Sequence, residues 1–362
     1  MEKEIKHDGF AKDIKAKDMS CQSCGATMKY SPERQKLFCE NCQSCKDIVF
    51  EMVVKKRLWE MRDKGLESTT DWANEVKNLK CPNCGAGVVL NKLEYTKNCP
   101  YCDTSLVGQE KCVDAIAPDG IIPFMFSDED ASLKYRTGIK KKFFAPNAFK
   151  KAPPVENIKG IYVPSFSFDA KTTSKYVGRL AEDSSYTDSK GRRRTSTSYQ
   201  NISGTYSSEL KDVIVESSSK IDQSQMTDIL PFDMSKIVKF DQGFIMGYTV
   251  EQYENTAEQC KMISVKIMEQ QIKSQILSQY SYDRVISFSM DTLYMDEKYM
   301  YYLLPIYKCD YKYKDKTYTT IMNGQTGKVG GGYPKSVLKI LLVVLGIIAL
   351  VAGIFALFMA LE

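Results

Sequence analysis

The sequence has one histidine, His7, and two tryptophans in 362 residues. His7 lies in residues 1–18, where Lys alternates with Asp and Glu, and we expect a disordered charged tail there because the stretch has little apolar surface to bury. Catalytic triads, His-Glu-x-x-His zinc sites and mixed Cys/His zinc sites are therefore excluded. We identify no other catalytic constellation, so we predict that the protein is not an enzyme and that its metal sites contain only cysteines.

A secretory signal is also lacking, because Met1–Phe10 is charged and contains no apolar run. We therefore expect this part of the chain in the reducing cytosol. Paired Cys-x-x-Cys motifs in that compartment bind metal rather than form disulfides. A thioredoxin-type redox motif would be single and would sit after a strand at the start of a helix, so these paired motifs favour metal.

The cysteines form two frames of the same design. Each frame has two Cys-x-x-Cys knuckles with fourteen residues between them, and every ligand of the second frame follows its counterpart by sixty residues. Four thiolates at this spacing, with a short β-hairpin spanning the gap, are typical of a tetrahedral Zn²⁺ site. We predict two zinc ions, one in a ribbon over 19–45 and one in a ribbon over 80–108, held by Cys21, Cys24, Cys39, Cys42, Cys81, Cys84, Cys99 and Cys102.

The first frame leaves one alternative open. Cys42-Gln-Ser-Cys45 is also a Cys-x-x-Cys, so the closing knuckle could use Cys45 in place of Cys39. Ser105 stands at the equivalent of Cys45 in the second frame, which favours Cys39. We expect the remaining cysteines, Cys112, Cys260 and Cys309, to be buried thiols.

Residues 46–79 are predicted to be a helical linker between the ribbons. Ile48, Met52 and Trp59 belong to an apolar stripe over Asp47–Lys64, with Gly65 as a C-cap. The run Lys55–Arg57 lies on the other side of this helix, and we expect it to be a solvated face.

Residues 115–330 are predicted to be a β-rich α+β domain. Ser127 caps a helix that reaches about Lys142, and Thr256 with Gln259 forms a capping box for a helix to about Tyr280. Residues 171–220 indicate short antiparallel strands joined by long polar turns. Further strands are expected at Ile161–Ala170, where Pro164 favours an edge or bulge, and at Arg284–Ser289, Tyr299–Tyr311 and Lys316–Met322.

Two short stretches have the composition of phosphate-binding loops. Asn323–Lys328 fails the P-loop pattern, which needs Gly at Met322 and Ser or Thr at Val329. A turn at Gly191–Arg194 makes Arg192, Arg193 and Arg194 a candidate contact for phosphate in nucleic acid or lipid headgroups, although a solvated hairpin tip is the commoner structure.

The C-terminal region contains 22 consecutive uncharged residues, Ile340–Leu361, which predict a single transmembrane helix after a flexible neck at 331–339. Lys335 and Lys339 precede this run and Glu362 follows it, so the positive-inside rule predicts a tail-anchored protein of the cell membrane with its bulk in the cytoplasm. Ala352, Ala356 and Ala360 are four residues apart, a spacing that allows helix–helix contact in a homo-oligomer.

The charge of the ribbon region argues against nucleic acid. Residues 1–112 contain 19 Lys and Arg against 17 Asp and Glu. Each Zn(Cys)₄ centre adds about two negative charges, so the loaded region is about −2 overall. A nucleic-acid-binding module would be basic.

Several motifs resemble a known family. They include Cys81-Pro-Asn-Cys-Gly-Ala, Lys142-Phe-Phe-Ala-Pro-Asn, Gly160-Ile-Tyr-Val-Pro, Leu304-Pro-Ile and Met322-Asn-Gly-Gln-Thr-Gly-Lys. Over residues 80–335 the chain resembles bacterial membrane proteins labelled TFIIB-type zinc-ribbon-containing, which have also been labelled primosomal- or replication-helicase-like. It departs from them at Ser165-Phe166 and at Tyr307, where we expect tryptophan.

The resemblance implies partners. Such proteins are often encoded beside a phage-shock-protein-A homologue and a flotillin-like SPFH protein, which they are thought to hold at a stressed membrane. We therefore predict a zinc-ribbon adaptor or scaffold, anchored in the lipid bilayer, that recruits such proteins in an envelope-stress response. The alternative is a membrane-tethered zinc-ribbon protein that binds nucleic acid in replication or transcription.

Overall fold

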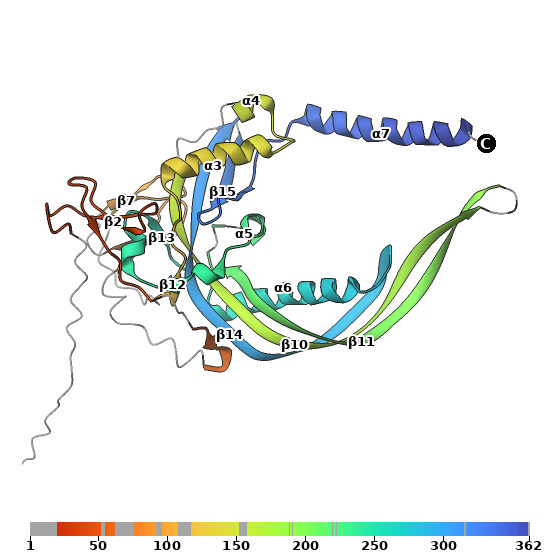
Figure 1. The fold of residues 1–362 in the computed structure, drawn as a ribbon, viewed down its shortest axis with the longest axis horizontal. Helices are drawn as coiled ribbons and strands as arrows, with labels where there is room; N and C mark the ends of the chain where they lie inside the picture. Colours follow the sequence, from red (N-terminus) through yellow and green to blue (C-terminus); the bar gives the residue numbers. More distant parts are fainter. Residues whose placement is uncertain are drawn as a thin grey trace, which may run out of the picture.

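The computed structural model describes residues 20–51, 55–61, 76–91, 96–107, 117–151, 158–187, 189, 191–218, 220–221, 223–314 and 316–360. The predicted tail at 1–18 and Cys112 lie outside these ranges. Within them the protein is α+β, as predicted: a mixed eleven-stranded sheet, a three-stranded sheet, a two-stranded sheet and five α-helices, the last of them apolar (Figure 1).

The small strands come first. The three-stranded sheet contains β1 (Lys29–Ser31), β2 (Lys36–Phe38) and β3 (Cys45–Lys46), and the two-stranded sheet contains β7 (Thr96–Asn98) and β8 (Ser105–Val107). The large sheet includes the short strands β4 (Arg57–Leu58), β5 (Val76–Lys80), β6 (Gly87–Asn91), β9 (Gly120–Ile121), β12 (Val238–Lys239) and β13 (Thr249–Glu251). Short 3₁₀ helices occur at η1 (Trp59–Met61), η2 (Met234–Lys236) and η3 (Gln242–Ile245).

Three long strands form a curved arm (Figure 1): β10 (Ile158–Thr187), β11 (Arg193–Glu216) and β14 (Arg284–Tyr313), all antiparallel with β10 in the centre. The prediction of short strands with long turns was wrong here. The polar residues that were expected in turns are paired across the arm instead, and charged residues also meet across it, as Lys171 does with Asp296 at 2.7 Å. A charged side chain on an exposed strand stabilises the strand pairing when an opposite charge lies beside it on the neighbouring strand.

Pro164 is not at an edge, because β14 pairs with β10 throughout this stretch. On the other side of β10 the partner changes from β13, whose pairing reaches Tyr162, to β11, whose last residue pairs with Ser165. Pro164, which has no N–H to donate, lies in the gap between these partners. The proline therefore marks a change of neighbour within the sheet.

Helix α6 (Ala257–Leu277) lies along the concave side of the arm (Figure 1). Its start confirms the predicted capping box of Thr256 and Gln259. Met268, Ile272 and Ile276 are fully buried in the cluster that also contains Phe168 and Leu210 of the arm. This apolar contact fixes one face of the three-stranded arm.

The body of the domain contains helices α3 (Asp128–Lys141), α4 (Asn147–Lys151) and α5 (Gln223–Ile229). Ser127 caps α3 as predicted, accepting a hydrogen bond from the backbone N–H of Asp130. Tyr307, one of the two departures from the family pattern, is buried and donates its hydroxyl to the carbonyl of Phe126 at 2.6 Å. It therefore fills a core position. Cys260 and Cys309 are buried, as predicted.

The prediction of a helical linker at residues 46–79 was wrong for the part of that segment that the structure describes. Residues 47–51 are irregular, and residues 57–61 form β4 and η1. Trp59 packs edge-on against Phe168 and Tyr299 of the large sheet, with ring centroids 5.9 and 5.4 Å apart. Contacts with residues more than a hundred positions away decide the conformation here, because they outweigh a weak local helix preference.

The glycine run at 330–332 is not simply a flexible neck. Strand β16 (Val329–Gly331) pairs with β15 (Lys316–Asn323), which forms a hairpin with β14. A Cβ added at Gly330 would lie 2.6 Å from the Cβ of Asp228. Gly330 is required because α5 approaches the backbone closely.

Helix α7 (Val337–Ala360) begins three residues before the predicted start. Its 24 residues measure about 36 Å, which exceeds the hydrocarbon thickness of a bilayer, about 30 Å. None of the window Val337–Ile354 is buried against the rest of the described chain. The helix is thus long and apolar enough to cross a membrane.

Candidate metal centres

Each predicted frame brings its four sulfur atoms together, with all Sγ atoms of a frame within 4.8 Å of one another. In the first cluster Cys21 Sγ lies 3.4 Å from Cys42 Sγ, and Cys24 Sγ lies 3.5 Å from Cys39 Sγ. The corresponding pairs of the second cluster, Cys81 with Cys102 and Cys84 with Cys99, are 3.5 and 3.6 Å apart.

These distances fit a metal and exclude disulfides. A disulfide needs about 2.05 Å between sulfur atoms. Four sulfurs at about 2.3 Å from one Zn²⁺ in a tetrahedron are about 3.8 Å apart, close to the spacing observed. The two clusters could therefore each hold one metal ion with four protein ligands and no open position for water.

The backbone of the two clusters repeats with the same sixty-residue offset. The N–H of Cys21 donates to the carbonyl of Ala26 at 2.8 Å, and the N–H of Cys81 donates to Ala86 at 2.8 Å. Gly25 and Gly85 both have positive φ, at 74° and 73°. In both knuckles backbone N–H groups donate to the first sulfur, those of Ser23 and Cys24 to Cys21 and those of Asn83 and Cys84 to Cys81. These donors stabilise the thiolates that a metal binds.

The expected hairpin across the gap occurs in the first frame, where β1 pairs with β2. In the second frame each knuckle instead sits on a hairpin of its own, Cys81–Cys84 between β5 and β6 and Cys99–Cys102 between β7 and β8. Strand β6 is paired with β5 and β13, so it is part of the large sheet. The second cluster is therefore built onto the body by backbone hydrogen bonds.

Cys45 is not part of the first cluster. It lies in β3, opposite Phe38, and its side chain is exposed. Its Sγ accepts a hydrogen bond from Arg34 at 3.5 Å. Among the described residues, Cys39 is thus the residue that completes the first group of four, as the comparison with the second frame favoured.

Hydroxyl groups at equivalent positions favour the thiolate form of one ligand in each cluster. Ser44 Oγ lies 2.9 Å from Cys21 Sγ and lowers the pKa of that thiol to about 5. Thr104, sixty residues later, lies 3.2 Å from Cys102 Sγ and lowers its pKa to about 6. Metals bind thiolates, so these hydroxyls help prepare both sites.

The first cluster is attached to the body through Tyr30 of β1. Its backbone N–H donates to the carbonyl of Met246 at 2.9 Å, and its ring packs edge-on against Phe244 with centroids 5.3 Å apart. The side-chain amide of Gln35 donates to the carbonyl of Phe124 at 3.1 Å. The cluster is therefore held by buried and directional contacts.

The second cluster is attached through Tyr101, which lies between two ligands. Its hydroxyl donates to Glu251 Oε2 at 2.6 Å. Lys220 Nζ donates to the carbonyl of Cys84 at 2.8 Å, and Lys159 pairs with Asp103 at 2.6 Å. Sequence reasoning missed Glu251 because nothing near it in the chain signals a partner in the ribbon.

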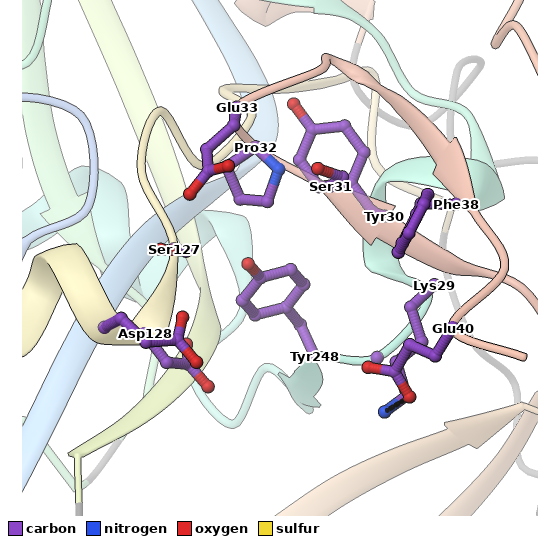
Figure 2. A pocket seen from close by; sticks show the side chains of 12 residues that line it. Lys29, Tyr30, Ser31, Pro32, Glu33, Phe38, Glu40, Ser127, Asp128 and Tyr248 are labelled. Atoms are coloured by element: carbon purple, nitrogen blue, oxygen red, sulfur yellow. Dashed lines mark hydrogen bonds and ion pairs between the residues drawn. The ribbon is translucent and has the colours of Figure 1, made fainter. Parts of the chain in front are cut away.

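A groove of about 320 Å³ lies beside the first cluster (Figure 2). Its walls are the β1–β2 hairpin and the start of α3, and Tyr248 projects into it. Its carboxylates are Glu33, Glu40, Asp128 and Glu129; Lys29 pairs with Glu40 at 2.7 Å. Burial, followed by the charge of Glu129, raises the pKa of Asp128. The groove is acidic overall.

The predicted arginine site lies elsewhere. Arg193 and Arg194 belong to the start of β11, opposite Thr187 and Tyr186, and Arg192 is in the turn before them. All three are exposed at the tip of the arm, away from both cysteine clusters (Figure 1). The structure does not bring them together with the metal centres.

The run Lys55–Arg57 is not a uniformly solvated face. Lys56 Nζ lies 2.5 Å from Asp169 Oδ1 and 2.6 Å from Asp212 Oδ1, and Arg57 pairs with Asp119. These partly buried ion pairs join the segment between the clusters to the sheet. Lys55 alone of the three is exposed, so the prediction was wrong for its two neighbours.

No family model matches the chain. No solved structure matches it. The chain is 26% identical over 222 residues, 61% of its length, to the uncharacterized protein YdjG of Bacillus subtilis (strain 168), and it spans 65% of that protein.

Proposed function

We propose that the protein is a single-pass membrane adaptor whose zinc-loaded modules assemble protein partners at the cytoplasmic surface. The observation that carries the proposal is the separation of two features of the structure. The cysteine clusters lie at one end, and the unburied apolar helix α7 leaves from another (Figure 1). A helix whose residues from Ile340 onward are uncharged, and which is left exposed, requires a lipid or protein environment.

Zinc is the metal that four thiolates favour, and its role here is structural. A closed Cys₄ site leaves no position for substrate or water, so it stabilises a fold and does not catalyse. Small knuckle modules obtain much of their folding free energy from metal binding. We propose that the two loaded modules present rigid surfaces to a partner.

Orientation follows from charge. Lys335 precedes α7 and Lys339 lies in its first turn, whereas Glu362 follows the helix in the sequence. Positive residues remain on the cytoplasmic side, so the body and both clusters would lie in the cytoplasm. Ala352, Ala356 and Ala360 would allow two such helices to associate.

The partners proposed are a phage-shock-protein-A-like or an SPFH protein. The proposal rests on the resemblance of the chain to bacterial TFIIB-type zinc-ribbon-containing membrane proteins, and it includes a role in envelope stress. The acidic groove beside the first cluster agrees with a protein partner and disfavours phosphate, because its carboxylates repel an anionic backbone.

The alternative, a membrane-tethered nucleic-acid-binding protein, is favoured by one observation, the exposed arginines 192–194 at the tip of the arm. That site would bind phosphate without reading sequence, and its affinity would fall steeply with salt. It would be independent of the cysteine clusters, which lie away from it (Figure 1).

The proposal is tested with three variants of the full chain. Removal of residues 337–362 should move the protein to the soluble fraction. Cys81→Ser should abolish recovery of the protein partner while leaving weak nucleic-acid binding unchanged, and changing arginines 192–194 to alanine should have the opposite effect. Submicromolar binding of DNA at physiological salt would favour the alternative, through the arginines if their change to alanine removes it and through the second ribbon if Cys81→Ser removes it.

A further inference from the structure

The base of α7 is fixed to the corner between α3 and α4. Lys339 Nζ donates to the carbonyl of Ala145 at 2.8 Å and to that of Phe143 at 3.2 Å. It also donates to Asn147 Oδ1 at 2.8 Å. The backbone N–H of Ser336 donates to the carbonyl of Phe144 at 2.8 Å. The surface of this corner therefore lies beside the point where α7 leaves the body (Figure 1).

This corner is densely basic. Lys140 and Lys141 end α3, and Lys150 and Lys151 end α4. The lysines at 140, 141 and 151 are exposed. In the described part of the chain none of the four forms an ion pair with a carboxylate.

The turn between β14 and β15 adds to the same surface. Tyr313, at the end of β14, packs edge-on against Phe149 of α4, with ring centroids 5.5 Å apart. Lys316 pairs directly opposite Tyr313, and Lys314 Nζ lies 5.9 Å from the centroid of the Tyr313 ring. Both lysines are exposed. Three separate segments of the chain thus place lysines on and beside the corner that holds the base of α7.

Helix stability explains some of these lysines without any ligand. Lysines at the C-terminal ends of helices interact favourably with the helix dipole, which accounts for those that end α3 and α4. The dipole does not account for the lysines of the β14–β15 turn. It also does not account for Phe143, which is 62% exposed although it is a large apolar side chain beside the helix base.

We propose that this corner is a binding surface for the headgroups of anionic lipids, with Phe143 inserted at the level of the interface. The inference rests on the proposed membrane insertion of α7, which would bring the corner against the bilayer surface. Lysines near an anionic leaflet are attracted to it, and an adjacent aromatic side chain gains from burial among the upper acyl chains.

The test uses the full chain in lipid nanodiscs. In Phe143→Trp the introduced indole reports on the interface, because lipids brominated near the top of the acyl chain quench it; the unsubstituted chain gives the background from Trp59 and Trp72. Quenching should be at least about twofold greater in discs that contain phosphatidylglycerol than in pure phosphatidylcholine discs. The difference should disappear near 1 M salt, where the Debye length is about 3 Å.

A charge variant and a matched control complete the design. Changing Lys140, Lys141 and Lys151 to Gln in the Phe143→Trp background should remove the preference for phosphatidylglycerol. The same change at Lys175, Lys266 and Lys298, which are exposed on the arm and on α6, should leave it intact.

The outcomes are distinguishable. If the chain fails to elute with the discs, the proposed membrane span is wrong and this inference fails with it. If the chain elutes with the discs but quenching is the same with both lipids, or the first triple variant behaves like the second, the lipid surface is refuted while the span stands. Loss of DNA binding in the first triple variant, without any lipid preference, would assign the corner to nucleic acid instead.

Discussion

Tyr101 and Glu251 join the second cysteine cluster to the core through one hydrogen bond of 2.6 Å. Glu251 is buried in β13, and Ser218 bridges it to a second buried carboxyl group, Glu216, with its hydroxyl on Glu251 and its backbone N–H on Glu216. Burial raises the pKa of Glu251 to about 7 and that of Glu216 to about 9. The cluster is thus docked on a carboxyl pair that retains protons near neutral pH.

Because Glu216 and Glu251 hold protons in the folded state, we predict that the free energy of unfolding falls as the pH rises. An unfolded glutamate has a pKa of about 4.3, so above that pH the folded state holds protons that the unfolded state has released, and raising the pH favours unfolding. We expect the free energy of unfolding to drop by about 3 kcal/mol between pH 7 and 9, and to level off about one pH unit higher, when Glu216 has titrated. Denaturant unfolding of the zinc-loaded chain in detergent at several pH values measures this.

Glu216→Gln should flatten the pH dependence, because the amide keeps the shape of the side chain without titrating. Glu209→Gln is the matched control, since Glu209 is exposed on the same strand and pairs with Lys211 at the surface. An equal pH slope in Glu216→Gln and in the unsubstituted chain would show that the pair does not hold these protons.

The metal content should distinguish cluster cysteines from Cys45. We expect two ions per chain, one after Cys39→Ser, one after Cys99→Ser, and two after Cys45→Ser, because a site that loses one of four thiolates binds zinc much more weakly. Native mass spectrometry of the full chain in detergent counts the ions. If an ion is lost in Cys45→Ser and none is lost in Cys39→Ser, then Cys45, and not Cys39, is the fourth ligand of the first cluster.

Lys56 should contribute to stability although the sequence gives no sign of it. Lys56→Met removes the cation between Asp169 and Asp212 and leaves two partly buried carboxylates facing each other. We expect a loss of about 1 to 3 kcal/mol in the free energy of unfolding. Lys55→Met, at an exposed neighbour, should change it by less than about 0.5 kcal/mol. Equal effects of the two changes would mean that the ion pairs are not maintained in solution.

Two glycines before α7, Gly330 and Gly332, allow a comparison between a tightly packed position and an open one. Gly330→Ala should cost about 1 to 3 kcal/mol, because its Cβ would lie 2.6 Å from the Cβ of Asp228. Gly332→Ala should be nearly neutral, because the nearest atom to its Cβ would be 3.6 Å away. Thermal unfolding of both variants checks this difference, and a neutral Gly330→Ala would support the flexible neck that the sequence indicates.

The features that the sequence determined are those with short-range causes. Cys-x-x-Cys knuckles, their glycines and the sixty-residue repeat depend on backbone geometry over a few residues, so spacing predicted which sulfurs come together. The capping box at Thr256 and the cap at Ser127 are equally local. The apolar run at the C-terminus needs no tertiary partner to form a helix, and its length alone indicates what it can cross.

Only the tertiary structure decided the rest, because the causes lie far apart in the chain. Lys56 meets Asp212 across 156 positions, and Tyr101 meets Glu251 across 150. The strands of the arm continue through polar residues because their cross-strand partners compensate them, and Gly330 is needed because α5 passes beside it. Local preferences are worth a few tenths of a kcal/mol per residue, whereas leaving a partly buried charge unpaired or losing a packed aromatic contact costs more, so the distant contacts prevail.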